Sequence, residues 1–207
     1  MRGLSARLNT GMKTFTPQLN LDSVVTAWRG HRPFAQWLVE TVRPDVVVDL
    51  GVDQGYSTFC FSEPGRGQVY AVDSFEGDEH TGFRDTQLAV QARLLEYDLC
   101  NVTVVKTRFE DLARAWHQPI DILHIDGLHT YEACKTDWGM WAGFVKPTGV
   151  ILFHDVVSFP AVRQVFDECG GQRLWFENDA GLGIVLDRRN TLLAELIAEA
   201  FPGVHRV

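Results

Sequence analysis

Short apolar segments alternate with amphipathic segments over most of this chain, from about residue 44 to residue 187. The apolar segments are rich in Val, Ile and Leu, and the first five are apolar almost throughout instead of at every second residue. Such strands are typical of a parallel sheet that is covered on both faces. We therefore expect strands at residues 46–50, 69–73, 102–106, 121–126, 149–154, 173–177 and 182–186.

The segments between these strands predict helices at residues 56–62, 85–97, 109–116, 131–144 and 161–168, and a last helix is expected at 191–200. Alternation of strands and helices implies right-handed crossovers and a doubly wound, Rossmann-like α/β fold. Only residues 178–181, which contain Asp179 and Gly181, separate the last two strands. This short connection predicts a hairpin-like return, so the last strand pair is expected to be antiparallel.

Residues 1–43 precede the first expected strand. Five apolar residues fall on one helical face and predict an accessory helix over residues 26–41, packed on the sheet and interrupted by Gly30 and Pro33. We expect residues 1–20 to form a flexible arm that a second copy of the chain could exchange in a homo-oligomer. The chain is accordingly divided into residues 1–43 and a domain formed by residues 44–207.

Composition excludes several classes of protein. The chain has 207 residues, which suits one larger α/β domain, and a formal net charge of −8 that is spread along it. Nucleic acid is an unexpected partner because phosphate binding needs clustered Lys and Arg. The longest apolar runs are far shorter than the ~20 residues that cross a bilayer, and no secretory signal is recognisable. Four widely separated cysteines predict reduced thiols in a cytoplasmic protein.

Acidic residues and histidines follow five successive expected strands, at the edge where open parallel sheets bind ligands. The first turn has the pattern GxxxG, formed by Gly51 and Gly55, whereas dinucleotide-binding turns have GxGxxG. Asp73 ends the second strand, in a position suited to accept hydrogen bonds from ribose hydroxyls. Together these features predict a nucleoside-type ligand. The other strand ends carry Glu110 and Asp111, Asp126 and His129, and His154 and Asp155.

Two stretches resemble a known family. Residues 46–57, VVVDLGVDQGYS, look like the first motif of class I S-adenosylmethionine-dependent methyltransferases. Residues 122–131, ILHIDGLHTY, with Asp137 and residues 146–155, KPTGVILFHD, are similar to the subgroup of small-molecule and sugar O-methyltransferases. The resemblance implies a seven-stranded sheet of order 3-2-1-4-5-7-6 with strand 7 antiparallel, in agreement with the expected hairpin.

The resemblance also implies which residues bind S-adenosylmethionine. The first loop would hold the methionine part, and Asp73 would hold the ribose. Adenine would lie beside the residues that follow Asp73, with Glu110 or Asp111 near its amine. The implied cofactor-binding residues are Asp49, Gly51, Gly55, Tyr56, Ser57, Asp73, Ser74, Phe75, Glu110, Asp111 and Asp126.

In metal-dependent relatives, carboxylates at the ends of strands 4 and 5 bind a divalent ion, and Asp126, His154 and Asp155 occupy those places here. An oxygen-rich site favours Mg²⁺, whereas His154, where many such enzymes have Asp, would also accept Mn²⁺, Fe²⁺ or Zn²⁺. Alternatively no metal binds and His154 is a base. His129 is the other candidate catalytic base, unless it only caps the helix that follows it.

The function expected from these residues is transfer of a methyl group from S-adenosylmethionine to a hydroxyl of a small molecule or sugar, with or without a divalent metal. A neutral alcohol is a poor nucleophile, so a metal or a base must assist loss of its proton. An NAD-dependent oxidoreductase and a non-catalytic nucleotide-binding module are the alternatives. The loop at residues 75–83 is either a cover over the ligand or a solvated connection. Nothing in residues 1–43 or 76–84 identifies the acceptor.

Overall fold

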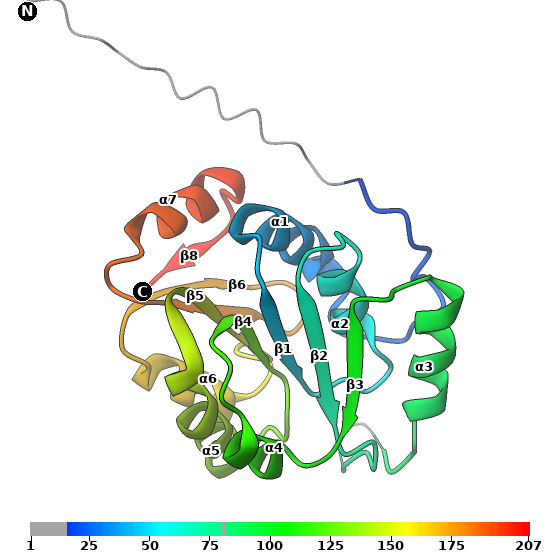
Figure 1. Cartoon of the computed structure of the whole chain (residues 1–207). Coiled ribbons are helices and arrows are strands. Elements are labelled where there is room, and N and C mark those ends of the chain that lie inside the picture. Colours follow the sequence, from blue (N-terminus) through cyan, green and yellow to red (C-terminus); the bar gives the residue numbers. More distant parts are fainter. Residues whose placement is uncertain (1–15, 80–81) are drawn as a thin grey trace, which may run out of the picture.

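A single mixed sheet of order β3-β2-β1-β4-β5-β7-β6-β8 runs through the computed structural model, which describes residues 16–79 and 82–207 (Figure 1). The pairs from β3 to β5 are parallel, and those of β7 with β5 and with β6 are antiparallel, as is the pair of β6 with β8. The strands are β1 (Val46–Leu50), β2 (Gln68–Asp73), β3 (Val102–Lys106), β4 (Ile120–Ile125), β5 (Val145–His154), β6 (Gln172–Phe176), β7 (Leu182–Leu186) and β8 (His205–Arg206).

The expected α/β fold and strand order are therefore confirmed. Every residue of β1 and β4 is buried, which explains why these strands are apolar throughout. The hairpin of β6 and β7 makes β7 antiparallel, as the short connection expected at residues 178–181 indicated. The sheet differs from the expected seven strands by β8, a two-residue strand that extends it to eight. A strand of two residues is too short to show a hydrophobic pattern in the sequence.

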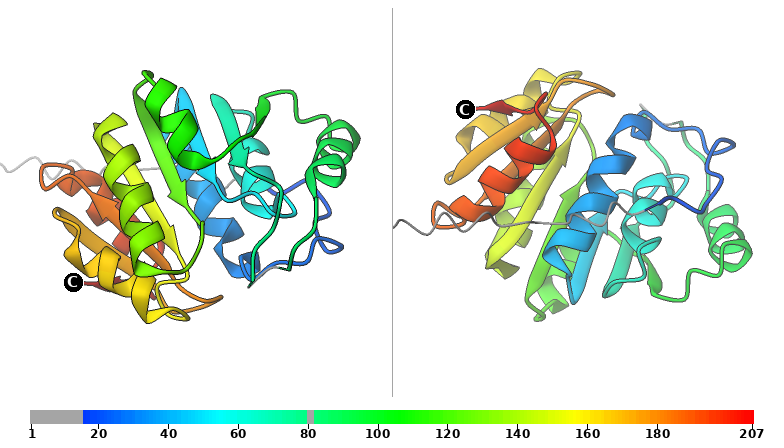
Figure 2. Two further views of the ribbon diagram at one scale, coloured as in Figure 1. Left: turned by 90° about the horizontal axis from the view of Figure 1, so that it is seen from below. Right: turned by 90° about the horizontal axis from the view of Figure 1, so that it is seen from above.

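Helices cover both faces of the sheet (Figure 2). One hydrophobic cluster joins the sheet to α1, α2, α3 and α7, and a second joins it to α4, α5 and α6. The helices are η1 (Arg29–His31), α1 (Arg32–Val42), α2 (Tyr56–Ser62), α3 (Gln87–Glu96), α4 (Phe109–Ala115), α5 (Tyr131–Trp141), η2 (Ala142–Phe144), α6 (Pro160–Glu168) and α7 (Thr191–Ala200). The sheet is thus the middle of three layers, and its carboxyl edge remains available for a site.

The N-terminal segment differs from the expectation of one helix over residues 26–41. The helix α1 begins only at Arg32, after the 3₁₀ turn η1, because Pro33 suits the first turn of a helix but not its interior. Trp28 lies before both elements and is nevertheless buried. Residues 1–15 of the expected arm lie outside the described residues. Within its remainder, Gln18 and Leu19 donate backbone hydrogen bonds to Glu63, so residues 18–19 are held against α2.

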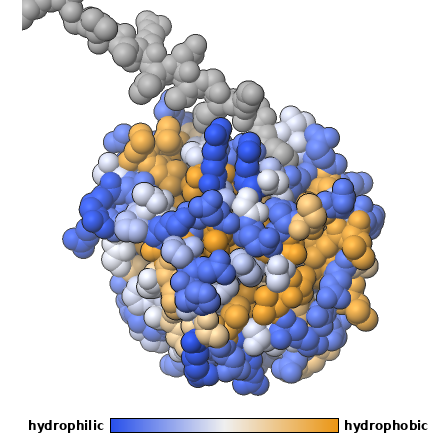
Figure 3. Space-filling model, in the orientation of Figure 1, coloured by the Kyte–Doolittle hydropathy of each residue, from blue (hydrophilic) through white to orange (hydrophobic). Residues whose placement is uncertain are grey.

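The surface mixes polar and apolar side chains (Figure 3). An apolar area lies over α3, whose exposed apolar residues include Leu88 and Leu95, and another lies over α7. Within residues 16–79 and 82–207, no helix is both long and apolar enough to cross a membrane. All four cysteines are free thiols, as expected. The division of the chain at residue 44 stays a prediction.

Candidate active site

A cavity of about 620 Å³ opens at the carboxyl ends of the first five strands. It gathers residues from the ends of β1, β2, β4 and β5, from α4 and from the segment before α1. Most residues expected to bind cofactor, metal or acceptor line it; they are Gly51, Tyr56, Ser57, Asp73, Ser74, Phe75, Glu110, Asp126, His129, His154 and Asp155. The expected residues outside this lining are Asp49, Gly55 and Asp111.

Asp49 lies beneath the cavity, where its side chain is completely buried. One carboxylate oxygen accepts hydrogen bonds from the hydroxyls of Ser57 and Thr58, and the other accepts from His124 Nδ1 at 2.7 Å. His124 Nε2 in turn accepts from the indole nitrogen of Trp28 at 3.2 Å. Asp49 therefore supports the first turn and the N-terminal segment from below.

The turn after β1 approaches β4 at Gly51. Its φ is +96°, and a Cβ atom there would lie 1.8 Å from the carbonyl oxygen of Asp126. Gly55 has a φ of +90° and precedes α2. Both glycines of the GxxxG pattern thus adopt positive φ values, which glycine adopts more readily than other residues. Gly55 therefore determines the shape of the turn but does not line the cavity.

Asp73 organises the two loops around it. One of its carboxylate oxygens accepts hydrogen bonds from the backbone of Val52 and Asp53, at 2.8 and 3.0 Å, and the other accepts from the backbone of Phe75 at 2.7 Å. A carboxylate has about four acceptor positions, so Asp73 retains capacity for a ligand hydroxyl. Arg84 bridges to Asp53 at 3.1 Å across the rim.

The residues after β3 separate. Glu110 lines the cavity, whereas Asp111 points to Arg114 at 2.7 Å with both side chains exposed. Of the two carboxylates expected near adenine, Glu110 therefore lines the cavity and Asp111 does not. Asp137 of α5, which the sequence resemblance included without a role, also lines the cavity. Burial, together with the nearby charge of Glu110, raises the pKa of Asp137 to about 7.

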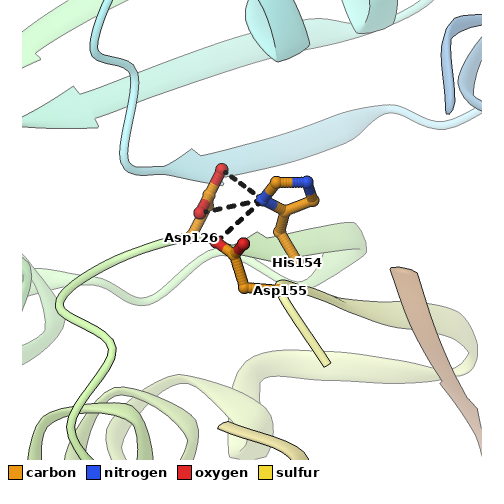
Figure 4. A group of neighbouring side chains, drawn as sticks. All are labelled: Asp126, His154 and Asp155. Atoms are coloured by element: carbon orange, nitrogen blue, oxygen red, sulfur yellow. Dashed lines mark hydrogen bonds and ion pairs between the residues drawn. The ribbon is translucent and has the colours of Figure 1, made fainter. Parts of the chain in front are cut away.

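Asp126, His154 and Asp155 meet at the ends of β4 and β5 (Figure 4). His154 Nδ1 lies 3.3 Å from Asp126 Oδ1 and 3.0 Å from Asp155 Oδ2. One ligand atom from each of the three residues lies within 4.8 Å of the others. Asp155 has a φ of +65°, in the left-handed region that a non-glycine residue rarely adopts. From this position, Asp155 Oδ2 contacts His154 Nδ1 at 3.0 Å and His129 Nε2 at 2.7 Å.

The charges of this cluster depend on one another. Burial lowers the pKa of His154, but the carboxylates of Asp126 and Asp155 outweigh burial and raise it to about 10. Burial raises the pKa of Asp126, but His154 and His129 reverse this effect and hold it well below its usual range. Without a bound ion, the two carboxylates thus favour the protonated, cationic form of His154 at neutral pH.

His129 lies beside this cluster, in the loop that leads to α5. Its Nε2 is 2.7 Å from Asp155 Oδ2, and its ring stacks on Phe159 at 4.1 Å between centroids. Hydrogen bonds to Asp126 and Asp155 outweigh burial and raise the pKa of His129 to about 9. The alternative that His129 caps α5 is wrong, because the side chain of Thr130 accepts the capping hydrogen bond from Ala133.

The sequence also missed residues that tertiary structure brings to the site. Trp28 lines the cavity, and His31 lies with its ring centroid 5.6 Å from that of His154. Phe159 lines the cavity beside His129. These residues come from segments far apart in the chain and carry no spacing motif. Glu76, Gly77 and Asp78 of the loop at residues 75–83 also line the cavity; residues 80–81 lie outside the described residues, and closure of this loop stays a prediction.

The fold is similar to several solved methyltransferases, each under 25% identical to this chain. An O-methyltransferase from Bacillus cereus in complex with SAH is 15% identical, with a TM-score of 0.59 over 75% of this chain and 79% of that one. TomG, an O-methyltransferase from Streptomyces achromogenes in complex with SAM, is 13% identical, with a TM-score of 0.60 over 83% and 91%. An rRNA methylase from Streptococcus thermophilus is 17% identical, with a TM-score of 0.57 over 74% and 94%.

Sequence comparison is more specific. A curated relative, an uncharacterized protein of Sinorhizobium fredii, is 36% identical over 137 residues. This stretch covers 63% of the present chain and 15% of that relative, so the chain corresponds to a small part of the longer protein. A family model for a methyltransferase domain matches residues 48–156, which is more than half of the chain and contains the residues of the cluster. The chain therefore belongs to the methyltransferase domain family, within the class I S-adenosylmethionine-dependent methyltransferases.

Proposed function

We propose that this chain transfers the methyl group of S-adenosylmethionine to a hydroxyl oxygen of a small molecule or sugar. One observation carries the proposal: a single cavity contains both a nucleoside site and a candidate catalytic site. Asp73 lies at the end suited to a nucleoside, and the cluster of Asp126, His154 and Asp155 lies in the same cavity beside His129. A methyl donor and a hydroxyl with its base can meet there. Family membership favours this reaction over an NAD-dependent oxidoreductase.

The cavity suits the cofactor in size and charge. Its volume of about 620 Å³ lies within the range of small-molecule sites. Gly51 leaves a backbone surface without a side chain at the first turn, where a ligand can approach closely. Acidic residues outnumber basic ones in the lining, which favours a sulfonium cation. Glu110 and Asp137 lie at the side where we place adenine.

The cluster also suits a divalent ion. Two carboxylates and an imidazole nitrogen are a donor set that Mg²⁺ or Mn²⁺ accepts, with Mn²⁺ favoured by the nitrogen. The three donor atoms lie within 4.8 Å of one another. We assign Asp126, His154 and Asp155 as the residues that hold this ion. When bound, it would lower the pKa of an acceptor hydroxyl.

The chain's own groups account for the remaining requirements of the reaction. The acceptor oxygen forms a bond to the methyl carbon while the carbon–sulfur bond breaks, and its electron pair stays on sulfur, which becomes a neutral thioether. The hydroxyl proton goes to Nδ1 of the neutral form of His129, whose Nε2–H Asp155 holds in place at 2.7 Å. Because the pKa of His129 is about 9, the share of this neutral form increases as the pH rises. The cavity aligns the two reactants, which contributes much of the rate. Without an ion, His154 is the alternative base.

Residues 25–28, Leu128 and Phe159 form an apolar wall near the cluster, and we assign them to the acceptor. Their aromatic rings suit the flat or apolar face of a small molecule or sugar. The composition of the chain continues to favour a cytoplasmic protein without a nucleic-acid partner. Exchange of the N-terminal arm in a homo-oligomer also remains part of this proposal.

The experiment is transfer of a labelled methyl group from S-adenosylmethionine to a panel of phenols, catechols and sugars. We expect a methylated hydroxyl product whose formation stops on chelation and returns with Mn²⁺ or Mg²⁺. Asp126→Asn should abolish the transfer, whereas Asp167→Asn, a change at the exposed end of α6, should not. Persistence after exhaustive chelation would remove the metal from the proposal. Cofactor binding without transfer to any acceptor would favour a non-catalytic nucleotide-binding module.

A further inference from the structure

The turn between β6 and β7 contacts the side of His154 that faces away from the carboxylates. The backbone carbonyl oxygen of Asp179 lies 3.1 Å from His154 Nε2 and 3.0 Å from His31 Nε2. Both imidazole rings are at least nine-tenths buried. In Figure 4, Nδ1 of His154 points at the two carboxylates and the other ring nitrogen points away from them. One carbonyl oxygen thus connects two buried histidines.

This contact fixes the position of a proton. A carbonyl oxygen accepts hydrogen bonds and cannot donate them, so each Nε2 atom must carry a hydrogen. A neutral His154 that keeps this hydrogen bond has its lone pair on Nδ1, the atom that faces Asp126 and Asp155. Donation from the second nitrogen to a carbonyl is also how metal-binding histidines are commonly oriented in proteins.

The turn itself is fixed by the segments on either side of it. A Cβ atom on Gly30 would lie 1.7 Å from a carboxylate oxygen of Asp179, so this close approach depends on glycine. On the other side, the backbone nitrogens of Val157 and Ser158 donate to the carbonyl of Ala180 at 2.9 and 3.1 Å. The loop that carries Asp155 and the segment that carries His31 therefore hold the turn between them.

We propose that His31 and the turn at residues 178–181 are positioning elements that keep the Nε2 hydrogen of His154 in place and leave Nδ1 as its reactive atom. His31 contributes the second donor to Asp179 and fills the space beside the His154 ring. The assignment of Nδ1 to a metal ion rests on the proposed function. The position of the hydrogen on Nε2 does not depend on that function and can be tested separately.

The first test measures Mn²⁺ and S-adenosylhomocysteine affinities by calorimetry. His31→Leu keeps the volume of the side chain but removes the donor, and we expect about a tenfold or greater loss of Mn²⁺ affinity. His31→Gln restores an N–H near the position of Nε2 and should recover most of it. His117→Gln, at an exposed histidine, is the control. S-adenosylhomocysteine affinity should stay unchanged in all variants. Equal Mn²⁺ affinities for wild type and His31→Leu would overturn the role of His31.

The second test reads the hydrogen directly, by nitrogen–carbon NMR correlation of the histidine rings in Zn²⁺-loaded protein. We expect His154 to carry its hydrogen on Nε2 and to show the metal-induced shift on Nδ1. The reverse pattern would overturn the inference. If no ion binds, only the metal proposal fails. Spectra recorded without an ion then test the role of His31. The Nε2 hydrogen of His154 should be protected from exchange in wild type and in His31→Gln but not in His31→Leu.

Discussion

Asp49 Oδ1 and His124 Nδ1 form a 2.7 Å hydrogen bond between two completely buried side chains beneath the first turn. Asp49 was expected to contact the cofactor, but its second oxygen is occupied by the hydroxyls of Ser57 and Thr58. Its effect on ligand binding is therefore indirect. It holds the floor of the cavity in the shape that the turn requires.

Substitution Asp49→Asn should destabilise the fold. An amide presents one acceptor and one donor group where three donors converge, so at least one buried donor loses its partner. We expect a loss of about 1–3 kcal/mol in the free energy of unfolding, measured with urea. Asp45→Asn is the control, because this side chain is 89% exposed at the start of the same region. Equal stability of both variants would contradict the buried network.

The close approach of the first turn to β4 can be tested at two glycines with positive φ. In Gly65→Ala, the new Cβ atom meets no other atom within 4 Å. The substitution should lower the free energy of unfolding by about 1 kcal/mol, because of the φ of +66° alone. Gly51→Ala adds a collision with the carbonyl of Asp126, so it should cost more and also impair binding of S-adenosylhomocysteine. Urea unfolding and calorimetry measure the two effects. Similar losses in both variants would show that the approach is unimportant.

The raised pKa of Asp137 predicts how the stability of the fold depends on pH. Its pKa rises from the ordinary 3.8 to about 7 on folding, so the folded state binds a proton more tightly than the unfolded state. Stability from this group is thus highest below pH 4 and falls as pH rises to about 7. A shift of about three units corresponds to about 4 kcal/mol at most.

Removing this charge should stabilise the protein at alkaline pH. Asp137→Asn is expected to raise the melting temperature at pH 8 more than at pH 5, relative to wild type. Asp167→Asn, at an exposed carboxylate, should give a curve parallel to that of wild type. A parallel curve for Asp137→Asn would mean that its carboxyl is ionised at both pH values.

Binding of Mn²⁺ should release protons. The carboxylates raise the pKa of His154 to about 10, so the ion must displace the proton on Nδ1 at neutral pH. We expect release of at least about one proton per ion, and an affinity that rises with pH. Calorimetry in two buffers of different ionisation enthalpy measures this number. His154→Gln should reduce the release, and binding without any release would contradict the assignment of His154 as a ligand.

The sequence predicted the features that depend on local patterns. Short runs rich in Val, Ile and Leu placed β1, β3 and β7 at their observed bounds, although β3 is only partly buried and β7 is antiparallel. The polar residues that end β2, β4 and β5 converge because a parallel sheet brings its carboxyl ends together. This rule suffices to place Asp73, Asp126 and Asp155 at one cavity before any side-chain contact is known.

What the sequence could not show depends on contacts between distant segments. His31 and Asp179 are separated by 148 residues, and no spacing relates them. Which carboxylate enters the cavity is also a tertiary property, since Glu110 and Asp111 are neighbours and only their orientation on α4 separates them. The helix at residues 26–41 was placed too early because side-chain periodicity does not report that Pro33 marks a first turn.

Equilibrium binding of S-adenosylhomocysteine by calorimetry tests the central assignment, that this cavity is a nucleoside site with its ribose end at Asp73. We predict micromolar affinity for wild type and for the control Asp167→Ala, and an affinity at least about tenfold weaker for Asp73→Ala. All three proteins should remain folded by circular dichroism. If folded wild-type protein bound neither S-adenosylhomocysteine nor S-adenosylmethionine at millimolar concentration, the assignment of the cavity would be contradicted.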